Sequence, residues 1–187
     1  MTEDEKKLLI DDHFLFKNGD KNHEASGLER NWPEARGIFF NEEKTFLVWI
    51  NEEDQLRIIS MQKGSNIMEV FKRLSIVAAK IEEKAKFAKD DHFGYISTCP
   101  SNMGTGMRAS VHIKLPKLMT NKDMMQSIAD KYSVQIRGIH GEHTETNDGV
   151  FDISNLRRLG RSEIELVQDM YDGVKALIYF GTQFKDK

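Results

Sequence analysis

Apolar and polar positions recur along the chain with periods that predict both strands and helices. Residues 45–50 and 56–61 are rich in β-branched and aromatic side chains, and five polar residues separate them, which predicts a hairpin. Residues 67–81 repeat apolar side chains at three- and four-residue steps after Asn66, a suitable N-cap, which predicts an amphipathic helix. The pattern predicts further strands at 95–98, 110–115, 134–139 and 150–153, and helices at 4–10, 121–132 and 162–180.

Two of these helices have an apolar stripe that we expect to face the core. For the helix at 67–81 the stripe consists of Ile67, Val70, Phe71, Leu74, Val77, Ala78 and Ile81. The last helix begins with Ser162 and Glu165, the two positions of a capping box. Its expected buried stripe is Ile164, Val167, Tyr171, Val174 and Ile178, and Gly173 in its middle costs up to ~1 kcal/mol relative to alanine.

The order of these elements predicts the fold class. Strands occur in runs, and helices do not alternate strictly with them, which favours an antiparallel sheet over a doubly wound parallel one. We therefore expect an α+β fold in which helices flank an antiparallel β-sheet of at least six strands.

Composition and charge narrow the classes of function. The 187 residues are 39% hydrophobic and 30% charged, as in globular proteins of one domain, and this composition excludes disorder as the main state. A formal charge of -3 provides no general basic field for nucleic acid or an anionic membrane. The single cysteine excludes an internal disulfide, and the chain has no targeting signal or long apolar run, so we expect a cytoplasmic location.

Three polar segments interrupt the apolar strands, and loops of this kind often carry chemistry. The first, at 51–54, contains three consecutive acids, which form either a solvated turn or a carboxylate site for a planar cation such as a guanidinium group. The second, at 99–108, places Cys99 among glycines and near Arg108. Cys99 is either a small buried residue or a reactive thiolate, and no Walker motif follows.

The third segment, at 137–149, is long for a loop in a compact domain and contains three glycines, which suits a segment that closes over a ligand or a simple exposed connection. His140 and His143 with Cys99 do not match a zinc-binding spacing, so no metal ligands are predicted. Arg57, Arg108 and Arg137 each lie at a strand end or loop edge. Guanidinium groups hold phosphate oxygens in pairs, so the three suggest a polyphosphate site without a P-loop.

Four segments together resemble the phosphagen kinases, the ATP:guanidino phosphotransferases, and most of all the members that act on arginine. The segments read TFLVWINEED at 45–54, CPSNMGT at 99–105, RASVHIKLPKL at 108–118 and RGIHGEHTE at 137–145. The resemblance extends over residues 5–178. It implies reversible transfer of the ATP γ-phosphoryl group to L-arginine, giving phosphoarginine and ADP, on an eight-stranded antiparallel sheet flanked by helices. It also implies Mg²⁺ held mainly by nucleotide phosphates and water.

The resemblance assigns roles to individual residues. Glu53 resembles the acid that grips the guanidinium group and accepts its proton, Glu142 the second acid, and Cys99 the thiolate beside the substrate. Arg57, Arg108 and Arg137 resemble the arginines that clamp phosphates. The nucleotide pocket implied by the resemblance comprises His13, Arg57, Arg108, Ala109, Ser110, Val111, His112, Arg137, Gly138, Ile139, His140, Gly141 and Glu142.

The chain departs from the family in several respects. Met103 stands where the cysteine motif of the family usually has isoleucine, leucine or valine, and His140 stands where arginine is common in members acting on arginine. The chain also resembles only the C-terminal catalytic-domain portion, so we expect the helical N-terminal domain to be absent. Two alternatives follow: a catalytically silent nucleotide-binding module, or a kinase acting on taurocyamine or lombricine. The family contains monomers and dimers, so a homodimer is one expected state, and neither nucleic acid nor a membrane is an expected partner.

Overall fold

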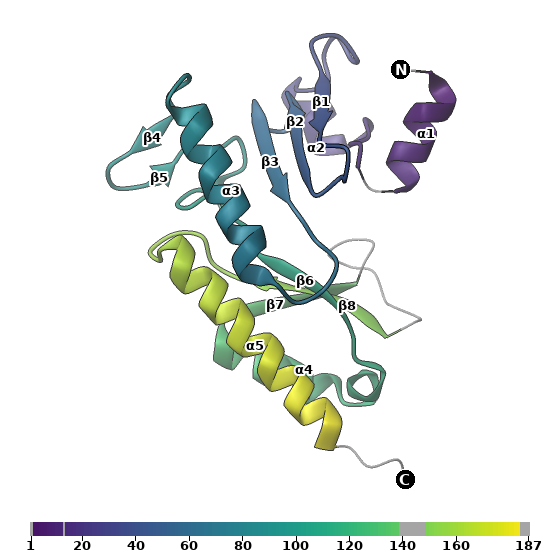
Figure 1. Ribbon diagram of the computed structural model, residues 1–187, viewed down its shortest axis with the longest axis vertical. Coiled ribbons are helices and arrows are strands. Elements are labelled where there is room, and N and C mark those ends of the chain that lie inside the picture. Colours follow the sequence, from purple (N-terminus) through teal and green to yellow (C-terminus); the bar gives the residue numbers. More distant parts are fainter. Residues whose placement is uncertain (1, 13, 139–148, 184–187) are drawn as a thin grey trace. The chain divides into compact units, whose positions relative to one another are not determined.

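The computed structural model describes residues 2–12, 14–138 and 149–183, and these fall into two compact units. The first unit comprises Met1–Phe87 and the second Ala88–Lys187 (Figure 1). Each unit has its own sheet and helices. Among the described residues, no helix is both long and apolar enough to cross a membrane.

The first unit is built on a three-stranded antiparallel sheet with the strand order β1-β2-β3. Its central strand contributes three buried residues in succession, Phe46, Leu47 and Val48. The Ser60 hydroxyl at the end of the edge strand donates to the Val70 carbonyl of the long helix at 2.9 Å. The elements are α1 (Glu3–Asp11), α2 (Lys21–Ser26), β1 (Gly37–Phe40), β2 (Phe46–Ile50), β3 (Leu56–Ser60) and α3 (Ile67–Glu82).

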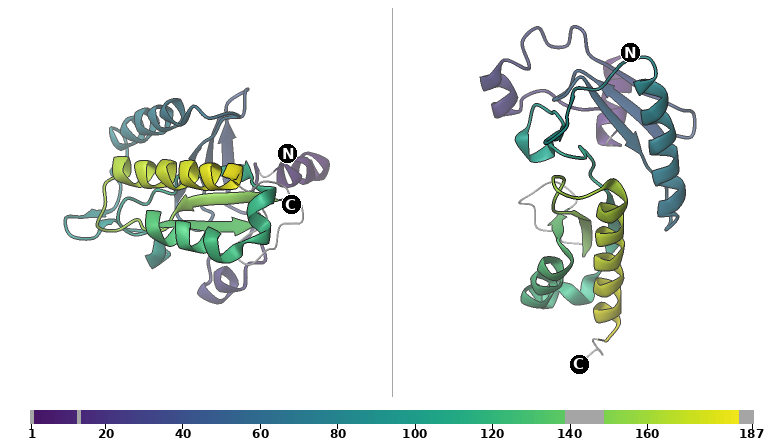
Figure 2. Two further views of the ribbon diagram at one scale, coloured as in Figure 1. Left: turned by 90° about the horizontal axis from the view of Figure 1, so that it is seen from below. Right: turned by 90° about the vertical axis from the view of Figure 1, so that its left-hand side faces the viewer.

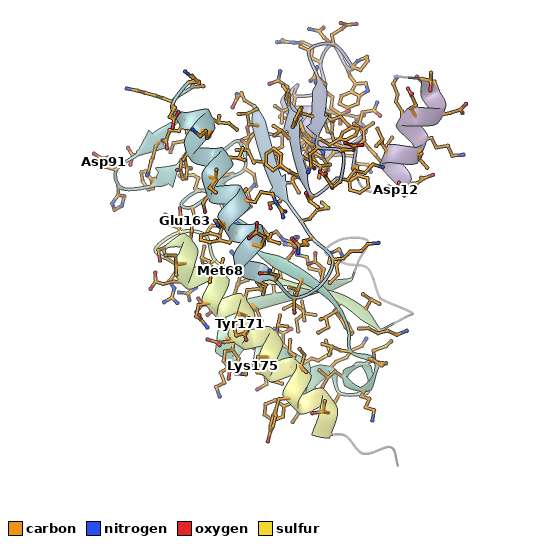
Figure 3. All side chains as sticks on the ribbon, viewed as in Figure 1. Asp12, Met68, Asp91, Glu163, Tyr171 and Lys175 are labelled. Carbon is orange, nitrogen blue, oxygen red and sulfur yellow. The ribbon has the colours of Figure 1, made fainter. Side chains whose placement is uncertain are left out.

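The predicted hairpin and helix of this unit are confirmed, with Asn66 accepting from the Glu69 amide as the N-cap of α3. Each residue in the predicted stripe of α3 is partly buried, and none is fully buried. Met68, outside that stripe, is 76% exposed (Figure 3). The sequence did not predict α2 or β1. These elements are short, at six and four residues, so they carry too little periodicity to be recognised.

The second unit contains a two-stranded ribbon and a three-stranded antiparallel sheet with the order β6-β8-β7. Helices α4 and α5 pack against each other and against strands of this sheet (Figures 1 and 2). The elements are β4 (Lys89–Asp90), β5 (Gly94–Tyr95), the 3₁₀ turn η1 (Pro100–Asn102), β6 (Ser110–Lys114), the 3₁₀ turn η2 (Pro116–Thr120), α4 (Lys122–Tyr132), β7 (Val134–Gly138), β8 (Val150–Asn155) and α5 (Glu163–Gln183).

The α+β class and the antiparallel pairing are confirmed, whereas the prediction of one sheet is not. The described strands form three separate sheets, of three, two and three strands. The strand predicted at 95–98 is also too long, because β5 ends at Tyr95. Beyond it, the Ile96 amide donates to the Ala88 carbonyl at 3.0 Å, and the Ser97 hydroxyl then donates to the Cys99 carbonyl at 2.8 Å.

The sheet of the second unit has one apolar face, which packs on the helices. Ile153 of β8 and Val134 of β7 are buried, with exposed fractions of 0% and 2%. A Cβ atom added to Gly173 of α5 would lie 2.9 Å from Val134 Cγ1. The helix therefore approaches β7 closely at this glycine, and the opposite face of the sheet is left for polar side chains.

The buried stripe predicted for α5 is wrong at Ile164, Tyr171 and Ile178, whereas Val174 is buried and Val167 is partly buried. Ile164, Tyr171 and Ile178 are 71%, 46% and 42% exposed, and Tyr171 projects from the helix near Lys175 (Figure 3). The residues that are buried instead are Leu166, Met170, Val174 and Leu177. Apolar residues lie on both sides of this helix, so periodicity alone does not choose between them. The close approach at Gly173 selects the side.

Gly173→Ala tests this packing. The added methyl group improves helix propensity by up to ~1 kcal/mol, but it meets a buried, β-branched side chain, and overpacking costs about 1–3 kcal/mol. We therefore expect net destabilisation of the second unit, measured as thermal unfolding by circular dichroism. Gly181→Ala in the same helix is the matched control, because its Cβ atom would meet its nearest neighbour at 3.7 Å. This substitution should stabilise the second unit slightly. Equal effects of the two substitutions would contradict the close approach.

Candidate active site

The polar face of the β6-β8-β7 sheet gathers charged side chains around one carboxylate. Asp152 of β8 is the register partner of both His112 on β6 and Arg137 on β7. Residues directly opposite in antiparallel strands point to the same face, so these three side chains share one. Arg108 reaches them from the segment before β6, and its Nη2 donates to Asp152 Oδ2 at 2.6 Å. Three predicted nucleotide-binding residues are thus brought together.

Asp152 is ionised on this face despite its burial. Its side chain is 13% exposed, and burial raises the pKa of Asp152, but the interactions with His112 and Arg108 outweigh this and hold it below the ordinary value. His112 Nε2 lies 3.8 Å from Asp152 Oδ1, an ion-pair distance. The Asp152 carboxylate raises the pKa of His112, against the opposing effects of partial burial and of Arg108.

The sequence prediction assigned no role to Asp152. Its one available signal was weak: a charged residue at an alternating position inside the apolar strand VFDISN. Its importance follows from cross-strand register, which places it opposite His112 and Arg137 at once. Register across two strands far apart in sequence is set by tertiary pairing, so pattern reading missed this residue.

The next row of the same face is polar but uncharged. Ser154 of β8 is the register partner of Ser110 on β6 and of Gln135 on β7. Ser110 Oγ accepts from Arg108 Nη1 at 3.4 Å, and Gln135 Oε1 accepts from Arg137 Nη2 at 2.7 Å. Each arginine therefore has a neutral polar side chain beside it on this face.

The other predicted nucleotide-pocket residues of this unit are placed as follows. Val111 alternates with Ser110 and His112 along β6, which puts its side chain on the apolar face. The Ala109 amide donates to Asn155 Oδ1 at 2.7 Å, so it is engaged within the protein. Gly138 is the buried last residue of β7. Ile139, His140, Gly141 and Glu142 lie outside the described residues, as does His13 of the first unit.

Cys99 lies immediately before the η1 turn and is partly buried. Its Sγ is 3.0 Å from Ser101 Oγ, and either atom can donate. The Asn102 amide donates to the Cys99 carbonyl at 3.0 Å, which closes the turn behind the thiol. The hydroxyl of Ser101 is thus the hydrogen-bonding neighbour of the thiol within this turn.

The end of the Cys99 segment is held by close backbone packing at Gly104. The Tyr95 amide donates to the Gly104 carbonyl at 2.7 Å, and the Thr105 amide donates to the Arg158 carbonyl at 3.0 Å. Gly104 has φ +106°, and a Cβ atom there would overlap the Arg158 carbonyl oxygen. Glycine is thus required both for the backbone conformation and for the contact with residues 158–159.

In the first unit, Glu53 lies in the loop at 51–55 that joins β2 to β3. This loop is braced at its start, because Asn51 Nδ2 donates to the Ala35 carbonyl at 2.8 Å and Arg36 Nε donates to the Asn51 carbonyl at 3.3 Å. Asn51 has φ +55°, a left-handed conformation that asparagine tolerates. The acids that follow are therefore presented from a fixed turn.

A guanidinium group already lies at these acids. Arg57 Nη2 is 3.0 Å from Glu52 Oε2 and 3.4 Å from Glu53 Oε2, and the carboxylate-bearing side chains are only 14% and 18% exposed. The Arg57 guanidinium carbon also lies 5.3 Å from the centre of the Trp49 ring. This loop thus places two carboxylates at a planar cation, the guanidinium group of Arg57, and its role as a site for a substrate cation stays a prediction. Glu52 is a second acid that the sequence prediction had not singled out.

Comparisons with known proteins agree with this geometry. Residues 1–183 match the family model described as ATP:guanido phosphotransferase, C-terminal catalytic domain. The chain is 56% identical over 181 residues to a protein of Anthopleura japonica named arginine kinase, covering 95% of this chain and 25% of that protein. It is 53% identical over 173 residues to arginine kinase 1 of Drosophila melanogaster, covering 92% of this chain and 49% of the relative.

Solved structures give the same result. A duplicated taurocyamine kinase from Schistosoma mansoni with bound transition state analog components matches with a TM-score of 0.90 and 47% identity, over 97% of this chain and 25% of that one. A lombricine kinase matches with a TM-score of 0.90 and 46% identity, over 97% of this chain and 51% of the other.

The fold and the matched residues define the class: this is a catalytic domain of the phosphotransferase type. The chain belongs to the ATP:guanido phosphotransferase family, which confirms the resemblance drawn from its motifs. It spans about half the length of the Drosophila relative and a quarter of the Anthopleura one.

The His112–Asp152 pair predicts a specific pH dependence. Because the folded pKa of His112 lies above its unfolded value, the pair's contribution to stability is fully present below the unfolded pKa and is lost as the pH rises through the folded one. Asp152→Asn should therefore lower the midpoint of the His112 titration, followed by NMR of the imidazole ring. Asp130→Asn, which removes an exposed carboxylate on α4, is the control and should leave that midpoint unchanged. An unaltered midpoint in Asp152→Asn would rule out the pairing.

Proposed function

We propose that this chain is a catalytic portion of an ATP:guanidino phosphotransferase that transfers the γ-phosphoryl group of ATP reversibly to L-arginine. The observation that carries the proposal is the clustering of Arg108, His112 and Arg137 around Asp152 on one sheet face. Side chains of this kind suit a polyanion, because guanidinium groups donate in pairs to phosphate oxygens.

The first unit supplies the complementary chemistry for the acceptor. Glu52 and Glu53 hold the Arg57 guanidinium group in this structure, which supports a site for a planar cation. In the proposed reaction Glu53 binds the substrate guanidinium group and accepts the proton that its nitrogen loses. Cys99, with Ser101 at 3.0 Å, places negative charge beside the same group as a thiolate. Glu142 is proposed as the second acid.

Phosphoryl transfer requires little covalent work from the protein, so positioning and charge neutralisation supply most of the rate. Arg108, Arg137 and Arg57 are proposed to neutralise the nucleotide phosphates, with His13 and His112 lining the pocket. Segment 138–149 is proposed to exclude competing water when substrates bind.

Mg²⁺ is proposed to arrive with the nucleotide, held mainly by its phosphates and water. On the polar face, arginine and histidine side chains surround Asp152, and Arg108 engages that carboxylate. Such a donor set fits phosphate oxygens better than it fits a cation. When bound, Mg²⁺ neutralises charge on the transferred group. The thiol at Cys99 must stay reduced in this scheme, so a cytoplasmic setting is proposed.

Arginine is the proposed acceptor because the two sequence relatives described above are named arginine kinases and are 56% and 53% identical. The taurocyamine and lombricine kinases have 47% and 46% identity. The test is a coupled assay of ATP consumption with each of the three acceptors, together with calorimetry of MgADP binding. Turnover fastest with arginine supports the proposal. MgADP binding without turnover identifies a silent nucleotide-binding module. A chain that shows neither turnover nor MgADP binding refutes both functions.

Glu53→Gln separates the acceptor site from the nucleotide site. Losing the carboxylate should lower turnover by about 10²–10⁴-fold, the usual contribution of a general base, while MgADP affinity stays within a few-fold. Steady-state rates and calorimetry measure the two effects. Glu42→Gln, an exposed acid in the preceding turn, is the control and should change neither. A large loss of MgADP affinity in Glu53→Gln would instead give Glu53 a structural role.

A further inference from the structure

Asn155, at the end of β8, is a buried polar residue whose side chain, within the part of the chain that the structure describes, forms hydrogen bonds to backbone groups. It is 1% exposed. Its Oδ1 accepts from the Ala109 amide at 2.7 Å, and its Nδ2 donates to the Met107 carbonyl at 3.2 Å and to the Arg157 carbonyl at 2.6 Å. The amide orientation follows from these partners, since an N–H group faces the oxygen and two carbonyls face the nitrogen.

Two of these bonds bracket Arg108. The Met107 carbonyl and the Ala109 amide lie on either side of it in the chain. In addition, the backbone amide of Asn155 donates to the Ala109 carbonyl at 3.3 Å. The backbone at Arg108 is therefore fixed on both sides. This aims the guanidinium group at Asp152, three residues before Asn155 on the same strand, with an N–O distance of 2.6 Å.

The third bond connects Asn155 to the Cys99 segment. Arg157 is followed by Arg158, whose carbonyl accepts from the Thr105 amide at 3.0 Å and lies against Gly104. Gly104 and Thr105 end the segment that begins with Cys99. The buried side-chain amide of Asn155 thus links the backbone on both sides of Arg108 to Arg157. The next residue, Arg158, holds the segment that carries Cys99.

We propose that Asn155 is a positioning residue, which sets the placement of Arg108 and of the Cys99 segment by bonding to Met107, Ala109 and Arg157. The inference rests on the proposed function, since it assumes that Arg108 binds phosphate. Burial of the amide explains why the arrangement depends on it, because removing the side chain leaves an N–H group and two carbonyls without their partner.

The test compares Asn155→Ala with two control variants in the 187-residue chain. Ser154→Ala removes the neighbouring buried hydroxyl, which belongs to a residue that is 0% exposed and whose Oγ makes no hydrogen bond to the described residues. Leu177→Ala opens a cavity in the α5 core and controls for lost stability. At a temperature where all variants remain folded, we expect MgADP affinity to fall about tenfold or more in Asn155→Ala and to stay within about twofold in both controls.

Asn155→Asp isolates the two donated bonds. The carboxylate still accepts from the Ala109 amide but faces the Met107 and Arg157 carbonyls, so MgADP affinity should fall. Burial raises the pKa of such a carboxyl, and its protonation restores one donor, so the variant should regain affinity relative to the original protein as the pH is lowered. Affinity equal to that of the original protein in both Asn155 variants would overturn the inference.

A second readout does not depend on nucleotide binding. In Asn155→Ala, hydrogen exchange of the Thr105 amide and alkylation of Cys99 by iodoacetamide should both change in rate, and both should stay constant in Ser154→Ala. If the original protein fails to bind MgADP, the nucleotide part of the proposed function fails. Unchanged exchange and alkylation in Asn155→Ala would defeat the positioning role whatever the outcome for nucleotide.

Discussion

The ion pair between Asp152 and Arg108, at 2.6 Å on the polar face of the β6-β8-β7 sheet, is the interaction on which the candidate site depends. A carboxylate as buried as Asp152 stays charged only with partners, and Arg108 and His112 are those partners. The same pairing fixes the guanidinium group of Arg108 in place, and Ser110 Oγ accepts a second bond from it, so the remaining N–H groups are the ones proposed to bind a phosphate. The contact that keeps Asp152 charged therefore also positions the arginine that is proposed to bind phosphate.

The packing of the second unit makes this face available. Helices α4 and α5 pack on the sheet, and Gly173 brings α5 close to Val134 on its apolar side. Alternation along each strand then places His112, Asp152 and Arg137 on the other side. The ends of the strands are fastened separately, by Asn155 at Arg108 and by Gly104 against Arg158. A rigid scaffold of this kind can present charged groups with little reorganisation, which is what phosphoryl transfer demands.

Local signals in the sequence were enough for much of this fold. Asn66 and the Ser162–Glu165 capping box marked real helix starts, and the hairpin around Glu53 followed from two apolar runs. The predictions that failed concerned features that tertiary contacts determine. Apolar residues on two sides of α5 left its buried side undetermined. Strand register alone placed Asp152 between His112 and Arg137. Asn155 was missed for a similar reason, since its partners at 107 and 109 are far away in sequence.

The most direct test of the central claim is a titration with MgADP followed by two-dimensional NMR of the backbone amides and the arginine side chains. We expect saturable shifts concentrated on the polar face, at Arg108, Ser110, His112 and Arg137, with Val174 and Leu177 in the α5 core little affected. Shifts that spread over α5 and the apolar face while the Arg108 and His112 signals stay in place would contradict it.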